Sequence, residues 1–292
     1  EDAKEVWSSF NVSLIYGIII AAMFLLGAEF FSMQILSLYT KDINIKCTNV
    51  KYGSDKKQYY KVYKQNSNKP TIFFIHGGGW CQGSPSLYSG VGKYFFKHGY
   101  TVVLVGYRLV PHYRYPIQIE DAFKALRHYI KNNDTNNGIV VGGYSAGAEI
   151  SSHLAFDTKR QNDYKINTSI LKGFISISGV LNFNKCNSNR SKRLIKRYIY
   201  KSNTDTCNPI NLINKNSTIS TLCIHGDSDT LIDIENSKSF INNLKNVNNN
   251  SYLKIIKGAE HEDTIDIVRG KGNEYSKYVF EFLEKIVQSE VN

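Results

Sequence analysis

Ser145 stands at the centre of a Gly-x-Ser-x-Gly pattern, Gly143-Tyr144-Ser145-Ala146-Gly147. The β-branched run before it, Ile139-Val140-Val141, predicts a strand, and the small residues after it predict the start of a helix. A sharp reversal from strand to helix lifts a serine hydroxyl out of the turn, and the helix N-terminus behind it favours developing negative charge. The pattern alone is also compatible with an ordinary turn that carries a solvated serine. Ser145 is therefore a candidate nucleophile, and the surrounding elements decide between these alternatives.

A second stretch, His76-Gly77-Gly78-Gly79-Trp80, directly follows the apolar run at 71–75, which predicts a buried strand. Consecutive glycines let backbone N–H groups face a ligand without an intervening Cβ, as an oxyanion hole requires. The competing interpretation is a flexible turn. The position of the glycines directly after a predicted buried strand argues against that interpretation. We expect an oxyanion hole that combines the N–H of Ala146 with N–H groups of this glycine loop.

Two further polar stretches also follow apolar runs. His225-Gly226-Asp227-Ser228-Asp229 comes after residues 220–224, and Lys257-Gly258-Ala259-Glu260-His261 comes after residues 252–256. Each candidate thus lies just past the C-terminal end of a predicted strand, where open α/β sheets place their ligands.

The elements that must position these groups alternate along the chain. Helical patterns occur at 92–97 and 119–131, and strand patterns at 101–105 and 171–178. This alternation predicts an α/β fold with a mostly parallel central sheet flanked by helices. Upstream, residues 43–47 and 59–63 alternate like exposed antiparallel strands.

Taken together and in this order, the motifs resemble the α/β-hydrolase superfamily, and within it the hormone-sensitive-lipase-like esterases. The resemblance is also carried by Tyr107-Arg108-Leu109-Val110-Pro111, Pro116 and Glu120-Asp121, and it extends from about Lys41 to the C-terminus. The tryptophan directly after the glycines, Trp80, also resembles the pattern of the kynurenine formamidase and isoprenylcysteine methylesterase branches. The resemblance implies an α/β-hydrolase fold, a Ser-Asp-His triad and hydrolysis of carboxylic esters.

The chain order in this fold is nucleophile, acid, histidine, and of the seven histidines only His261 follows the aspartates. His76 and His225 are expected to be buried structural residues. The family pattern places the acid second in the Asp-x-Asp pair, at Asp229, and Asp227 is the alternative. Asp229 would orient His261 and stabilise its imidazolium form.

The resemblance also implies which groups surround the reacting atoms. The usual oxyanion donors correspond to Gly78 and Gly79, with Gly77 as a further donor if the loop is set one residue over. Trp80 and Tyr144 are candidates for the substrate pocket, although aromatic residues are more often plain core. No zinc spacing, phosphate loop or dinucleotide motif occurs, so we expect neither a metal nor a cofactor.

The composition narrows the classes of partner. A net charge of +11 and a pI near 9.2 invite a nucleic-acid interpretation, but the lysines are scattered rather than gathered into a stripe. We expect no nucleic-acid partner, and attraction to an anionic membrane surface is the alternative use of this charge. The five cysteines form no C-x-x-C pair, so ordinary thiols are expected, although Cys186 and Cys207 could pair in an oxidising compartment. The oligomeric state stays open.

Residues 1–40 differ from the rest of the chain. Residues 12–28 carry no charge, Glu29 interrupts, and apolar residues continue to Leu36. The uncharged run lies at the lower edge of the roughly 17–25 residues that span a bilayer. We expect an apolar helical segment at 1–40 that is either membrane-associated through residues 12–36 or a cap on the hydrolase. We favour the membrane over a soluble, cytoplasmic location.

Residues 41–292 are expected to form the catalytic domain. Between about 182 and 218 the composition changes to Asn, Ser, Lys and Arg, with a helical patch at 194–200. The resembling fold carries a small cap insertion at this place.

The leading hypothesis is a serine carboxylesterase that works through an acyl-enzyme and acts on a small-molecule ester. The first alternative is an amide or formamide hydrolase such as a kynurenine formamidase, which the triad cannot distinguish. The second is a non-catalytic binding module on a hydrolase fold. The presence of Ser145, Asp229 and His261 together argues against that module.

Overall fold

The computed structural model describes residues 45–247, 250–271 and 274–288 of the 292-residue chain. The apolar run at 12–36 lies outside the described residues, so its two predicted roles stay predictions. Within the described part, none of the helices combines the length and the apolar character that a membrane span needs.

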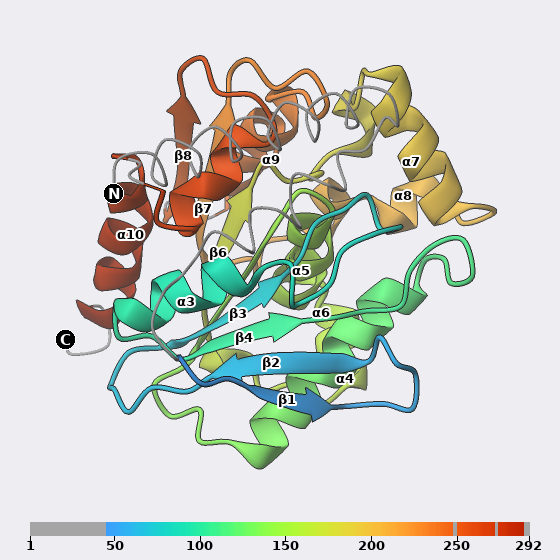
Figure 1. Ribbon diagram of the computed structural model, residues 1–292. Coiled ribbons are helices and arrows are strands. Elements are labelled where there is room, and N and C mark those ends of the chain that lie inside the picture. Colours follow the sequence, from blue (N-terminus) through green and yellow to red (C-terminus); the bar gives the residue numbers. More distant parts are fainter. Residues whose placement is uncertain (1–44, 248–249, 272–273, 289–292) are drawn as a thin grey trace, which may run out of the picture. The chain divides into compact units, whose positions relative to one another are not determined.

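An eight-stranded sheet forms the centre of the described residues, in the order β1-β2-β4-β3-β5-β6-β7-β8 (Figure 1). Its strands are β1 (Thr48–Lys51), β2 (Tyr59–Tyr63), β3 (Thr71–Ile75), β4 (Val102–Val105), β5 (Ile139–Tyr144), β6 (Leu171–Ile177), β7 (Ser220–Gly226) and β8 (Ser251–Ile256). β1 pairs antiparallel with β2, and β2 pairs antiparallel with β4. The other neighbours pair in parallel, which confirms the mostly parallel sheet. Residues of β3, β4 and β5 are buried throughout, as expected of strands covered on both faces.

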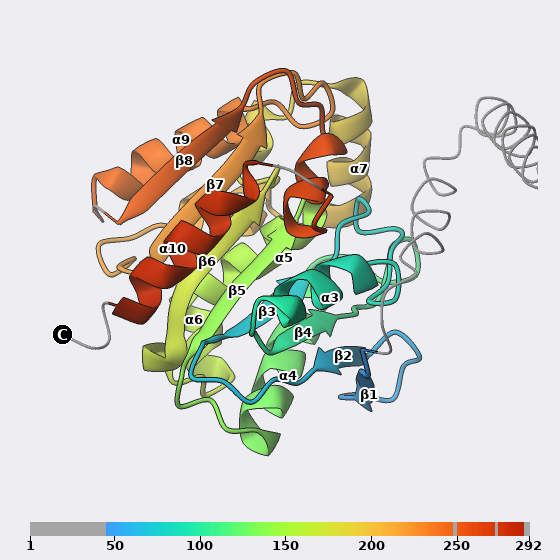
Figure 2. The ribbon, with the colours of Figure 1, turned by 60° about the vertical axis from the view of Figure 1, so that its left-hand side comes forward.

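Helices cover both faces of this sheet. The α-helices of the described residues are α3 (Ser89–Lys97), α4 (Ile117–Asn132), α5 (Ala146–Phe156), α6 (Thr158–Asp163), α7 (Asn189–Ile199), α8 (Thr204–Cys207), α9 (Glu235–Lys245) and α10 (Ser276–Gln288). Ring contacts join α3 to α10 through Tyr94 and Phe280, and α5 to α9 through Phe156 and Phe240. Figure 2 shows α3 and α10 together in front of the sheet, with α5 behind it. All residues of α5 are buried, which is typical of a helix in the middle of a covering layer.

The first two strands differ from their predicted form. β1 begins at Thr48, and residues 45–47 of the predicted strand at 43–47 are irregular. In β2 the alternate residues Tyr60 and Val62 are buried, and so is Tyr63, so that strand is not an exposed one. The reason is its place in the sheet, because β2 has β4 on its other side and only β1 forms the edge.

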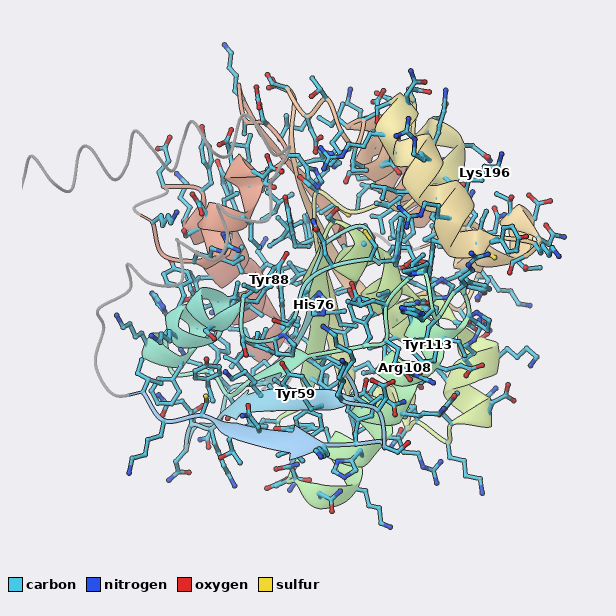
Figure 3. All side chains as sticks on the ribbon, turned by 45° about the vertical axis from the view of Figure 1, so that its right-hand side comes forward. Tyr59, His76, Tyr88, Arg108, Tyr113 and Lys196 are labelled. Atoms are coloured by element: carbon cyan, nitrogen blue, oxygen red, sulfur yellow. The ribbon has the colours of Figure 1, made fainter. Side chains whose placement is uncertain are left out.

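Residues 182–218, where the sequence predicts a cap insertion, lie in the segment between β6 and β7. It contains the short 3₁₀ turns Phe183–Lys185 and Pro209–Leu212 together with α7 and α8. Helix α7 begins at Asn189, before the predicted patch, because Ser188 caps its first turn by accepting from the N–H of Ser191. Its residue Lys196, labelled in Figure 3, is exposed, whereas Tyr198 is buried. Cys186 and Cys207 are free thiols.

Candidate active site

Ser145 occupies the turn between β5 and α5. Its backbone has φ 53° and ψ −121°, a strained conformation for a residue other than glycine, and its N–H donates to the Ile177 carbonyl. Strand β5 and helix α5 lie close together here, since a Cβ on Gly143 would be only 2.4 Å from the carbonyl carbon of Gly147. The local geometry is therefore the strand–serine–helix turn that the Gly-x-Ser-x-Gly pattern predicts.

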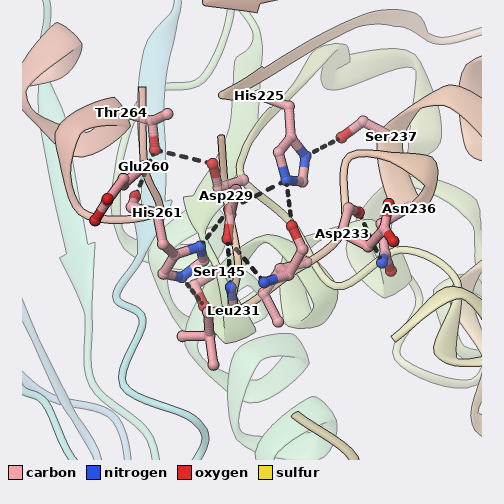
Figure 4. A network of polar contacts seen from close by, with 12 residues as sticks. Ser145, His225, Asp229, Leu231, Asp233, Asn236, Ser237, Glu260, His261 and Thr264 are labelled. Carbon is pink, nitrogen blue, oxygen red and sulfur yellow. Dashed lines mark hydrogen bonds and ion pairs between the residues drawn. The ribbon is translucent and has the colours of Figure 1, made fainter. Parts of the chain in front are cut away.

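Three of the predicted residues form one hydrogen-bonded chain, shown in Figure 4. His261 Nε2 lies 2.9 Å from Ser145 Oγ, and His261 Nδ1 lies 2.6 Å from Asp229 Oδ2. A carboxylate only accepts, so Nδ1 carries the proton and Nε2 is left to accept the proton of the serine hydroxyl. The structure thus brings together Ser145, His261 and Asp229 from the ends of three different strands.

The carboxyl group of Asp229 is buried and fully partnered. Its Oδ1 accepts the N–H groups of Leu231 and Ile232, at 3.0 and 2.8 Å, and its Oδ2 also lies 3.2 Å from His225 Nε2. Burial by itself would raise the pKa of Asp229, but the hydrogen bonds from His225 and His261 outweigh burial and hold that pKa well below its usual range. Asp229 therefore stays an anion beside the imidazole that must become positive.

Asp227, the alternative acid, does not reach His261. Its side chain is exposed and accepts the N–H of Gly258 at 2.6 Å, which ties two loops together. Between the two candidates the structure brings only Asp229 to the histidine.

The two histidines predicted to be structural are both buried. His225 bonds to the Ile232 carbonyl through Nε2 and to the Ser237 hydroxyl through Nδ1, each at 2.8 Å. His76 donates from Nδ1 to the Gly77 carbonyl at 2.8 Å, and burial lowers its pKa to about 4, so it is neutral at pH 7. His76 also lies close to Tyr88 (Figure 3).

The glycine loop presents three consecutive residues with positive φ, namely Gly78 at 120°, Gly79 at 56° and Trp80 at 61°. In the part of the chain that the structure describes, the N–H groups of Gly78, Gly79 and Ala146 have no acceptor. The N–H of Gly77, by contrast, donates to the Tyr88 hydroxyl at 3.1 Å. The prediction of Gly77 as a further oxyanion donor is therefore wrong, because its N–H group is already bonded to the Tyr88 hydroxyl.

Trp80 packs in the core instead of lining a substrate pocket, which corrects that prediction, whereas the pocket role of Tyr144 stays a prediction. Trp80 is only 1% exposed, and its ring stacks on that of Tyr198 in the core at a centroid distance of 4.3 Å. Tyr144 is 5% exposed, and its hydroxyl donates to the carbonyl of His261 at 3.0 Å. Both side chains are fixed by these contacts and help to hold the site in place.

Several residues that position the triad were not expected from the sequence. Thr264 donates to the same His261 carbonyl as Tyr144, at 2.9 Å, and Ser237 supports His225 (Figure 4). These residues stand outside the motifs and carry no distinctive pattern of their own. Only their neighbours in space give them a role.

The arrangement has what nucleophilic acyl substitution needs. A serine hydroxyl lies against a neutral imidazole acceptor, and the imidazole is oriented by an anion. The three N–H groups without an acceptor among the described residues belong to the glycine loop and to the first residue of α5. Among the described residues, no group of three or more His, Cys, Asp or Glu side chains is arranged to hold a metal ion.

Changing Gly78 to alanine is expected to lower kcat by about 10²–10³-fold, the cost of a lost oxyanion donor. A Cβ there would lie 2.3 Å from the Gln82 carbonyl oxygen, and φ +120° is a conformation that L side chains rarely adopt, so the loop must shift. Gly90→Ala in α3 is the matched control, because its Cβ would meet nothing closer than 3.7 Å. Steady-state kinetics on a short ester checks both variants, and equal kcat values would contradict the role of the loop.

Comparison with known proteins gives a consistent family assignment. The family model described as BD-FAE matches residues 58–244, more than half of the chain. Among curated proteins, the chain is 30% identical over 138 residues to arylacetamide deacetylase of Oryctolagus cuniculus, covering 44% of this chain and 34% of that protein. It is 26% identical over 247 residues to esterase LipC of Mycobacterium tuberculosis, covering 75% and 60%. The chain thus spans less than two thirds of the length of these relatives.

Among solved structures, esterase B of Lactobacillus rhamnosis HN001 superposes with a TM-score of 0.76 at 17% identity. The superposition covers 94% of this chain and 96% of that one. At this identity the likeness shows the fold, and it extends over nearly the whole of both chains.

Proposed function

Since the chain belongs to the BD-FAE family of α/β-hydrolases, we propose that it is a serine hydrolase that cleaves carboxylic esters through an acyl-enzyme. The observation that carries the proposal is the continuous chain from Ser145 Oγ through His261 to Asp229, placed beside free backbone donors. The relatives named above, two of them esterases and one a deacetylase, support the same reaction class.

The geometry supports the following sequence of steps. Ser145 Oγ attacks the ester carbonyl carbon while His261 Nε2 takes the hydroxyl proton. The carbonyl oxygen becomes an oxyanion and accepts the N–H groups of Gly78, Gly79 and Ala146. His261 then returns the proton to the leaving alcohol, which leaves an acyl group on Ser145. A water molecule, deprotonated by the same histidine, releases the acid and restores the serine.

The test is a panel of p-nitrophenyl esters of increasing acyl length, run beside N-formylkynurenine. We expect hydrolysis of esters, with a burst of nitrophenol equal to the amount of enzyme on those esters whose deacylation is slower than their acylation. Turnover of the formamide without turnover of any ester would replace the ester assignment with the formamidase alternative. Absence of both activities, and of labelling by a fluorophosphonate, would leave the non-catalytic module.

We also propose that residues 12–36 associate with a membrane and place the enzyme there. The support is the run at 12–28, which lacks charge and carries Ile, Leu and Phe with little polar relief. Deleting residues 1–40 is expected to move the protein from the membrane fraction to the supernatant while activity on short esters is kept, as fractionation and a p-nitrophenyl ester assay measure. The opposite outcome is a full-length protein that is soluble without detergent and a deletion variant that aggregates, which would establish a cap.

A further inference from the structure

Glu149, in the first turn of α5, carries a carboxyl group that the proposed reaction does not use. The side chain is 0% exposed. Its Oε2 accepts the indole N–H of Trp80 at 2.9 Å, and the hydroxyl of Tyr198 lies 3.3 Å from both carboxylate oxygens. His153 Nε2, one helical turn further on, lies 3.3 Å from Oε1. A buried carboxylate persists only where such partners offset its lost hydration, so this one is held in a defined place.

The partners of Glu149 continue into a chain of alternating acidic and basic groups. His153 Nδ1 lies 3.4 Å from Asp157 Oδ2, and the guanidinium of Arg160 pairs with the same oxygen. Burial by itself would lower the pKa of His153, but the hydrogen bonds to Asp157 and Glu149 outweigh burial and the net shift is upward. The negative charge of Glu149 is thus offset by basic groups of α5 and α6 on the Oε1 side, while Oε2 accepts the N–H of Trp80.

Trp80 needs such an anchor because its backbone is strained. A φ of 61° is unfavourable for a residue other than glycine, and such a conformation persists only when its surroundings hold it. The indole is held by Glu149 through its N–H, by Tyr198 through stacking and by Phe183 at its edge. The two residues just before Trp80 are Gly78 and Gly79, whose N–H groups face the reacting oxygen in the proposed reaction.

We propose that Glu149 is the positioning residue of the oxyanion loop, and that it sets the place of the Gly78 and Gly79 donors by holding Trp80. The inference rests on the proposed function, since an oxyanion hole matters only to a hydrolase. Glu149 itself touches no reacting atom.

The same contacts tie the loop to the cap insertion. Tyr198 belongs to α7, and it both stacks on Trp80 and contacts Glu149. One turn earlier in α7, Leu194 lies so close to the loop that a Cβ on Gly79 would be 3.1 Å from its Cδ1. The position of α7 and the geometry of the oxyanion loop therefore depend on one another, both through this direct packing and through the Glu149 carboxylate, which contacts both.

The kinetic test compares three variants of the full chain. Glu149→Ala is expected to lower kcat by about 10²-fold with KM nearly unchanged, because a misplaced oxyanion donor weakens binding of the transition state and not of the substrate. Glu149→Gln keeps an oxygen that can accept the Trp80 N–H and is expected to recover most of that loss. Phe240→Leu, a buried change against Phe156 and Phe174, controls for lost stability and is expected to leave kcat unchanged.

A further variant, Trp80→Phe, tests the same contact from its other side if Glu149→Ala does not fold. Trp80→Phe removes the indole donor but keeps an aromatic ring for Tyr198, and it is expected to lower kcat to a similar extent. In the double variant Trp80→Phe with Glu149→Gln, the glutamine oxygen has no indole N–H left to accept, so kcat should equal that of Trp80→Phe alone.

Fluorescence gives a readout that is independent of activity. Trp7 and Trp80 are the two tryptophans of the sequence, so Trp7→Phe leaves Trp80 as the single reporter. In that background, adding Glu149→Ala should raise quenching of Trp80 by acrylamide, whereas adding Phe240→Leu should not. A wild-type protein that hydrolyses no ester would refute the proposed function, and fluorescence would still decide whether Glu149 holds Trp80. An active wild type with unchanged kcat in Glu149→Ala and Trp80→Phe, or a change confined to KM, would overturn the positioning role.

Discussion

Replacing Ser145 with alanine is expected to abolish ester hydrolysis, with a fall in kcat of about 10⁶-fold, as for the loss of a serine nucleophile in other triads. The reason is that no other described hydroxyl lies against His261 Nε2, which is 2.9 Å from Ser145 Oγ. The residual rate would come from binding and the oxyanion donors alone. The measurement is kcat on a p-nitrophenyl ester, together with labelling by a fluorophosphonate probe that reacts only with an activated serine.

The control for this variant is Ser276→Ala. Ser276 is also buried, but its hydroxyl donates to the Ile267 carbonyl at 2.8 Å and so has no basic group to activate it as a nucleophile. It should keep both labelling and turnover. Unchanged hydrolysis by the Ser145→Ala variant would refute the esterase assignment.

Changing Asp229 to asparagine is expected to lower kcat by about 10⁴-fold, as in the related triad. An amide can donate to His261 Nδ1, which would leave Nε2 protonated and unable to accept the proton of Ser145 Oγ. It also removes the negative charge that stabilises the imidazolium. The measurement is kcat on a short ester at a pH where the wild type is fully active, with unfolding temperatures to show that both proteins are folded.

Asp227→Asn is the matched control, because it makes the same chemical change two residues away. Asp227 is exposed and holds the Gly258 N–H instead of the histidine, so this variant should keep kcat close to the wild-type value. If Asp227→Asn caused the larger loss, the acid of the triad would have to be reassigned to that residue.

Much of this protein could be read from local patterns. Strands β3, β5 and β7 appear where their apolar runs predicted them, and the α/β-hydrolase fold is confirmed by the sheet and by the structural neighbours. Ser145 at the turn and His261 as the last histidine followed from spacing and chain order alone. These features are local because each depends on the type of a few consecutive residues at the end of a strand, and parallel strands bring those ends to one edge.

Only the tertiary structure showed which polar groups and side chains are already hydrogen-bonded or packed against other parts of the protein. The sequence could not show that the Gly77 N–H is bound by Tyr88, or that Trp80 turns into the core. It favoured Asp229 over Asp227 only through a family resemblance, whereas the contact with His261 separates them directly. The role inferred for Glu149 likewise depends on contacts with Trp80 in the glycine loop and Tyr198 in α7, which lie 69 and 49 residues away in the sequence. Such contacts leave no periodic pattern in the sequence, because they form only when distant segments pack together. Packing also distinguishes polar groups of the same chemistry, since it buries and pairs some of them and leaves others without a partner.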